Sequence, residues 1–159
     1  NEFVQGLEWR YYEQLEWQLL KDNKGSQDIQ KYVKALNQMY LEEEALWHDG
    51  QDGFEWIEHE NINENMLIFL RKTPNMEDFI IAVFNFSGKD HEKYPLGVPL
   101  EDGEYEVILD SNEKKFGGSY QGKKRKYKAI KKSWNYREQY IEIKIAKNSA
   151  IFLKYKKEK

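Results

Sequence analysis

Short apolar runs, each bounded by turn residues, follow one another through most of the chain after residue 53. Runs of this length, rich in β-branched and aromatic residues, are typical of the strands of an antiparallel sandwich. In YIEIKI (residues 140–145) the isoleucines alternate with Glu142 and Lys144, which predicts one buried face and one face in water. We expect strands at residues 54–59, 66–72, 79–86, 104–109, 127–131, 140–145 and 150–155.

One of these runs differs from the others. FIIAVFNF (residues 79–86) is apolar at nearly every position and lacks the polar alternation of a half-exposed strand. A strand that is covered on both faces has this pattern. We therefore expect residues 79–86 to form a central strand of the sheet.

Before the strands, GSQDIQKYVKALNQMY (residues 25–40) is the one convincing helix. Ser26 is a suitable N-cap, and Asp28 falls in the first turn, where a negative charge is favourable. An apolar stripe follows at spacings of four, three and four residues and needs a partner surface. The stripe consists of Ile29, Val33, Leu36 and Tyr40.

The helical period ends after Trp47, and HDGQDGF follows with Gly50 and Gly53 as turn residues. A new unit begins at this point. We expect a first part at residues 1–47 and a β domain at residues 48–159.

Charge is divided unevenly along the chain. Residues 1–110 carry 9 Lys and Arg against 24 Asp and Glu, whereas residues 111–159 carry 16 against 4. The basic excess peaks in the segment Lys123 to Lys132, whose interleaved Tyr127 would suit a patch that binds nucleic acid or another phosphorylated polymer. The alternative is a solvated hairpin whose lysines keep a strand edge from pairing with other chains. Since no recognition helix or stacking sheet accompanies the patch, we do not expect nucleic-acid binding.

Motifs for catalysis or metal binding are missing from the sequence. There is no cysteine, the three histidines are scattered, and HExxH, GxSxG and glycine-rich phosphate loops are absent. Carboxylates are plentiful, but the run Glu42 to Glu44 is more typical of a solvated helix end than of an acid/base pair. We expect no metal and no cofactor in the chain, and the residues alone leave a glycosidase-type pair of carboxylates open.

No apolar stretch is long enough to cross a membrane, and no signal peptide is recognisable. A cysteine-free chain of this kind suits a reducing compartment. We therefore expect a soluble, cytoplasmic protein without membrane contact, and the missing initiator methionine suggests a fragment.

Six segments together carry a resemblance to a known family. EFVQGLEW, LEWQLL, LNQMY, GFEWIE, LIFLRK and VFNFS occur in this order, and the chain resembles the C-terminal end of the 1,4-alpha-glucan branching enzymes of the alpha-amylase clan. The resemblance runs from Asn1 to the last expected strand. Its most specific positions are Glu2, Phe3, Gln5, Glu8, Trp9, Leu15, Glu16, Trp17, Leu19 and Leu20.

The resemblance implies a domain order and a parent activity. Residues 1–47 would be the post-strand loop and last helix of a (β/α)8 barrel, and residues 48–159 a small all-β C-terminal domain. Enzymes of this family transfer an α-1,4-glucan segment to a 6-hydroxyl through a covalent intermediate, which requires carboxylates on both sides of the scissile bond. The family's catalytic Asp, Glu and Asp would lie upstream of Asn1, so we expect this chain by itself to be inactive.

Glucan contact is the activity that could remain, because sugar faces stack on exposed aromatic rings. Trp56 is the first candidate, although Phe54 lies two residues away on the same strand face and either ring could instead fill the core. Trp9 and Trp17 could line the substrate groove as part of the post-barrel loop. For Trp17, an anchoring role within LEWQLL is the alternative.

The expected partners are therefore α-glucan, the catalytic barrel of a longer enzyme and, for the chain by itself, a second copy. Self-association would use the stripe of Ile29, Val33, Leu36 and Tyr40, because large uncovered apolar surface is unfavourable in water. The competing hypothesis is a free-standing module that binds glucan or, through the basic hairpin, nucleic acid.

Overall fold

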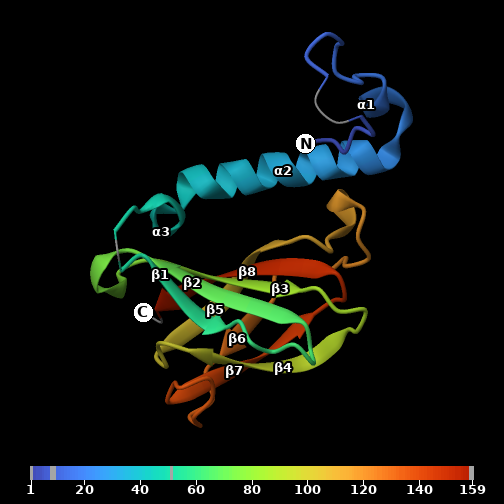
Figure 1. The fold of residues 1–159 in the computed structure, drawn as a ribbon. Coiled ribbons are helices and arrows are strands. Elements are labelled where there is room, and N and C mark those ends of the chain that lie inside the picture. The colour runs from blue at the N-terminus through green and yellow to red at the C-terminus, as the bar shows by residue number, and fades with distance from the viewer. Residues whose placement is uncertain (1, 8–9, 51, 158–159) are drawn as a thin grey trace.

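The computed structural model of the chain describes residues 2–7, 10–50 and 52–157. Three helices precede the strands, namely α1 (Leu19–Asp22), α2 (Lys24–Glu42) and α3 (Glu44–Trp47) (Figure 1). The strands are β1 (Phe54–Glu58), β2 (Met66–Lys72), β3 (Phe79–Asn85), β4 (His91–Val98), β5 (Gly103–Asp110), β6 (Lys126–Lys128), β7 (Gln139–Ile145) and β8 (Ser149–Lys157). Two short 3-10 helices are η1 (Pro74–Met76) and η2 (Lys114–Phe116). None of the helices within these described ranges could cross a membrane.

The strands form two antiparallel sheets, which confirms the expected all-β architecture. One sheet has the order β1-β2-β3-β8-β5-β6, and the other consists of β4 and β7. A buried apolar core fills the space where the sheets face each other, and the three isoleucines of β7 are fully buried as predicted. The central members of this core are Ile68, Leu70, Ile81, Val83, Leu96, Val98, Tyr105, Ile141, Ile143, Ile145, Ile151 and Leu153.

Strand β3 is covered on both faces, as its apolar sequence predicted. It lies between β2 and β8 in unbroken register. Ile81 and Val83 point into the core between the sheets, whereas Ile80 and Ala82 belong to a second apolar cluster on the opposite face. Figure 1 shows α2 along this opposite side of the six-stranded sheet, with β4 and β7 on the other side.

Helix α2 packs on the sandwich with a face that differs from the predicted stripe. Met39 is buried in the second cluster, and the ring of Tyr32 meets that of Phe116 edge to face at 5.2 Å. Of the predicted stripe, Leu36 joins this contact, but Ile29 and Tyr40 stay exposed. The helix has two adjacent apolar faces, offset by about one residue or 100°, and the sequence pattern alone did not distinguish which of them meets the sheet.

The start of α2 also differs from the prediction. Asn23, not Ser26, is the N-cap, and its side-chain oxygen accepts a hydrogen bond from the Ser26 N–H at 3.2 Å. Asp28 lies buried, where Lys24 and Lys31 contact its carboxylate at 2.5 and 3.1 Å. These hydrogen bonds, first of all that from Lys24, lower the pKa of the Asp28 carboxyl below its ordinary value. Asn and Ser are comparable caps, so local preference could not decide between them.

Polar contacts attach the helical segment to the sheet. Lys154 of β8 binds the carboxylate of Glu43, which lies between α2 and α3. The guanidinium of Arg71 on β2 donates to the backbone carbonyl of His48 at 2.8 Å and to that of Ala45 at 3.4 Å. The segment from Glu43 to His48, which contains α3, is therefore bound to the strands at three points.

Strand β4 was not predicted, and β6 is shorter than predicted. HEKYPLGV begins with polar residues and contains Pro95 and Gly97, which argue against a central strand. The structure accommodates them because β4 pairs only with β7. In place of the predicted strand 127–131, β6 ends at Lys128, and Ile130 forms a single bridge with Tyr140.

The packing of α2 on the sheet predicts different effects for substitutions at a buried and at an exposed position of this helix. Met39 is 9% exposed within the second cluster, whereas Leu41, two residues later, is 72% exposed. Met39→Ala should lower the free energy of unfolding by about 2–5 kcal/mol, because it leaves a cavity, and Leu41→Ala should change it by less than about 0.5 kcal/mol. Chemical denaturation of both variants checks this. Equal losses would mean that α2 does not pack as described.

Candidate functional site

Trp56 lies on the outer face of the edge strand β1. Its side chain is 46% exposed, stacks on the His59 ring at 5.4 Å and meets the Phe54 ring edge to face at 4.8 Å. Phe54 is exposed on the same face, as the spacing predicted, and neither ring fills the core. The pair is therefore available to a ligand in the chain as described.

Further aromatic rings continue from Trp56 across neighbouring strands. The ring of Phe69 on β2 lies 5.3 Å from that of Phe54 and 5.8 Å from that of Phe84 on β3, and Phe86 stacks on Phe84 at 6.0 Å. A cavity of about 450 Å³ separates Phe54 and Phe69 from the end of α2. We call the rings of Phe54, Trp56, Phe69, Phe84 and Phe86 the aromatic row.

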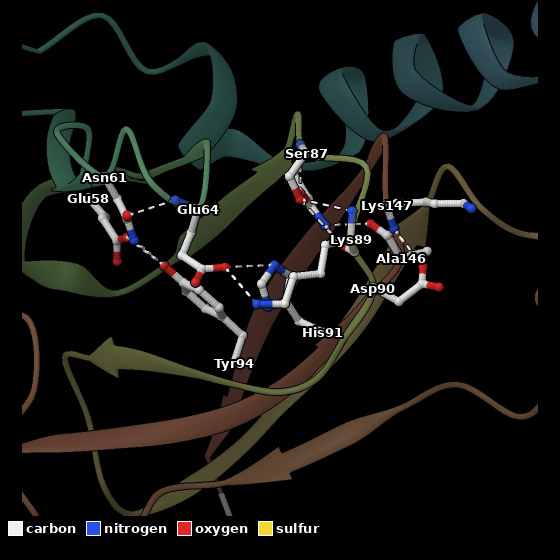
Figure 2. Close-up of polar contacts among 11 residues, drawn as sticks. Glu58, Asn61, Glu64, Ser87, Lys89, Asp90, His91, Tyr94, Ala146 and Lys147 are labelled. Atoms are coloured by element: carbon white, nitrogen blue, oxygen red, sulfur yellow. Dashed lines mark hydrogen bonds and ion pairs between the residues drawn. The ribbon is translucent and has the colours of Figure 1, made fainter.

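Beside the row, the loop after β1 forms one wall of a polar cavity of about 590 Å³. Glu58 holds this wall together. Its Oε1 accepts hydrogen bonds from the Tyr94 hydroxyl and the Asn61 amide, both at 2.5 Å, and its Oε2 accepts from the Asn135 amide at 3.1 Å. Figure 2 shows Tyr94, which lies on β4 of the other sheet, pointing toward Glu58 and Asn61. Three segments far apart in the sequence are thus fixed around one carboxylate.

Two rings of β4 complete this side of the cavity. Burial, together with the hydrogen bond to Glu58, raises the pKa of Tyr94, so its hydroxyl stays protonated and donates. His91 packs edge to face on Tyr94 at 5.2 Å, and its Nε2 lies 3.5 Å from the Glu64 carboxylate (Figure 2). Lys89 lies 3.3 Å from the same carboxylate. The cavity therefore presents fixed amide, carboxylate and imidazole groups.

The other two predicted tryptophans are not brought to this place. Trp17 is exposed and stacks on the buried ring of Phe3 at 5.5 Å, which agrees with the anchoring alternative. It precedes α1, which lies at the opposite end of α2 from α3 and β1 (Figure 1). Trp9 lies outside the described residues.

The buried carboxylates act in ion pairs. Asp28 is held by two lysines, Glu106 contacts Lys156 at 2.5 Å and Lys124 at 3.5 Å, and Asp110 binds Arg125. Lys156 lowers the pKa of Glu106, whereas burial raises that of Asp110. Within the ranges that the structure describes, no three His, Asp or Glu side chains are grouped for a metal ion. Each of these three buried carboxylates is therefore held by at least one cationic side chain.

The basic segment Lys123 to Lys132 is largely paired with acidic residues. Lys126 contacts Glu104 at 2.9 Å, and Lys131 contacts Glu101 at 3.3 Å, in addition to the pairs formed by Lys124 and Arg125. The uneven charge along the sequence is therefore balanced across the sheet, in agreement with the solvated hairpin. No observation favours the nucleic-acid alternative.

Trp56 was already a candidate from the sequence, whereas the polar cavity was not predicted. Glu58 and Asn135 are 77 residues apart, and no local pattern reveals that they meet. One sequence signal could have indicated the turn that borders this cavity. In WNYR (residues 134–137), an Asn that suits a tight turn stands between two aromatic residues.

Comparison with known proteins finds relatives that match nearly the whole chain. The chain is 96% identical to the 1,4-alpha-glucan branching enzyme GlgB of Fusobacterium nucleatum over 99% of its own length, which is 26% of that protein. It is 37% identical to GlgB of Halothermothrix orenii and 34% identical to GlgB of Lactobacillus acidophilus, each over 97% of the chain and 24% of the relative.

The chain thus spans about a quarter of the length of the curated relatives that it matches. Residues 56–156, from Trp56 on β1 to the second-to-last residue of β8, match a family described as the alpha amylase C-terminal all-beta domain. This range includes every strand of both sheets except the first two residues of β1 and the last residue of β8. The chain belongs to the alpha amylase C-terminal all-beta domain family.

Proposed function

We propose that this chain is the non-catalytic C-terminal part of a 1,4-alpha-glucan branching enzyme. The observation that carries the proposal is the 96% identity to a branching enzyme of which the chain matches only 26%. The ion-paired state of the buried carboxylates supports it, because none of them is free to act as nucleophile or acid. The longer enzyme would make α-1,6 branches with carboxylates upstream of this chain. We also propose that it is located in the cytoplasm.

The domain division expected from the sequence is part of the same proposal. Residues 1–47 would end the catalytic barrel, and residues 48–159 would form the C-terminal domain. The outer face of α2 supports a contact with such a barrel, because Ile29, Tyr40 and Leu41 remain exposed after the helix has packed on the sandwich. In the chain by itself, the same face would pair with a second copy.

We further propose that the domain itself binds glucan at Trp56. The exposed indole, with His59 and Phe54 fixing its orientation, offers a flat face for the apolar side of a glucose ring. A single platform gives weak affinity, because binding must offset the cost of ordering a flexible sugar chain. We expect dissociation constants on the order of millimolar.

The first prediction from this proposal concerns activity. The purified chain should form no new α-1,6 linkages on amylose, because the branching reaction needs carboxylates that it does not supply. Linkage analysis by NMR checks this, with a full-length branching enzyme as the positive control. Branching by the chain alone would refute the proposal.

The second prediction concerns Trp56. Trp56→Ala should weaken maltoheptaose binding about tenfold, because the stacking face is lost, while Trp17→Ala should leave binding unchanged. Titration followed by NMR chemical shifts measures both. If the folded Trp56→Ala variant binds as well as the original chain, Trp56 is not part of the glucan site.

The third prediction concerns self-association through α2. Light scattering should show the chain dimerising as its concentration rises, and the double variant Ile29→Glu and Tyr40→Glu should remain monomeric, because charge on this face opposes its burial. Both positions are exposed, so the variant should keep its fold, which circular dichroism can verify. A chain that is monomeric at every concentration would disprove the dimer.

A further inference from the structure

A tight turn between β6 and β7 borders the polar cavity. Trp134 and Arg137 exchange two backbone hydrogen bonds, at 3.0 and 2.9 Å, around Asn135 and Tyr136. Both central residues have positive φ, at 47° and 59°, as in the hairpin turn for which Asn-Gly is the favoured sequence. Tyr136 therefore occupies the position that normally favours glycine.

Tyrosine in this conformation is strained, and the strain is not offset by packing. The Tyr136 side chain is 109% exposed, so it gives no burial in return. Met76 adopts a similar φ of 59°, but its side chain packs against the main core. A strained residue whose ring lies wholly in water is a candidate for contact with something outside the chain.

The turn is held firmly in place. The Asn135 side chain accepts a hydrogen bond from the Gly97 N–H at 3.0 Å and donates to Glu58 at 3.1 Å. A Cβ on Gly97 would lie 2.3 Å from the Trp134 carbonyl oxygen, so β4 passes directly against the turn. Trp134 and Tyr136, which flank Asn135, are thus presented on a support fixed from two other strands, and Trp134 is exposed as well. Such pre-organisation lowers the entropic cost of binding.

The cavity beside the turn indicates the chemistry of a ligand. Its lining combines the two exposed aromatic rings with polar side chains that include Glu60, Asn61, Glu64 and Lys93. Aromatic faces for an apolar ring surface, next to donors and acceptors for hydroxyl groups, suit a pyranose better than a purely apolar or purely anionic ligand. His59 also lines this cavity and stacks on Trp56, so the cavity adjoins the aromatic row.

We propose that Trp134 and Tyr136 form a second stacking platform for α-glucan, and that a chain of several glucose units extends to it from Trp56 past His59. This inference rests on the proposed glucan binding, and it adds the turn at residues 134–137 and the polar cavity to the site. Two linked platforms on one glucan bind more tightly than either alone, because the second contact becomes intramolecular.

The test uses the 159-residue chain and maltoheptaose, with backbone amide shifts in the turn and at Lys93 as the readout. Tyr136→Ala should raise the dissociation constant about fivefold or more, and Tyr136→Phe should restore the original value, because the ring and not the hydroxyl provides the platform. Tyr12→Ala, which removes another exposed tyrosine, is the matched control and should have no effect.

Thermal unfolding distinguishes a binding role from a structural one. Tyr136→Gly should bind as weakly as Tyr136→Ala yet raise Tm by about 2–4 °C relative to it, since glycine relieves the strain. A large loss of Tm in Tyr136→Ala would overturn the inference by giving the ring a role in the fold. Binding that depends on Trp56 but not on Tyr136 would overturn this inference alone. A chain that binds neither maltoheptaose nor glycogen would overturn the proposed glucan binding itself.

Discussion

The burial of β3 on both faces is the constraint on which the rest of the structure depends. A strand with isoleucines on both sides loses several kcal/mol if either side stays in water. One side is covered by the small sheet of β4 and β7, and the other by α2, α3 and the segment around Phe116. The contacts of Arg71 and Lys154 hold the helical cover in place, so the helical segment and the sandwich form one packed unit.

Charge is organised around the same sheet. The acidic side chains of β5 and the loop before it lie opposite the basic segment Lys123 to Lys132 and the end of β8. A lysine-rich segment that resembles a nucleic-acid patch in the sequence is thereby largely neutralised in the fold. The exposed aromatic rings lie at the other edge of the sheet, where β1 lies, beside a cavity lined by amide, carboxylate and imidazole groups.

Features with a local signal could be predicted from the sequence, and features that depend on distant contacts could not. Alternation in β7 and the unbroken apolar run of β3 fixed their burial, and the spacing of Phe54 and Trp56 correctly put both rings on one face. Strand β4 was not predicted because Pro95 and Gly97 argue against a central strand. A two-stranded sheet tolerates such residues. The predicted stripe of α2 did not reveal that the helix has a second apolar face, and it is this second face, with Tyr32 and Met39, that meets the sandwich. The cavity around Glu58 depends on residues from three strands and a turn, so no window of sequence contains it.

The docking of α2 also has a mechanical consequence. A helix of 19 residues is a stiff rod about 28 Å long, and here it is clamped to the sandwich along one side and by the contacts of Arg71 and Lys154 at its far end. A tilt of about 5° at one end of such a rod displaces the other end by about 2–3 Å. A protein or domain bound to the outer face of α2 would therefore move together with the sandwich as one rigid body. The aromatic row would move with it, because no hinge separates the row from α2.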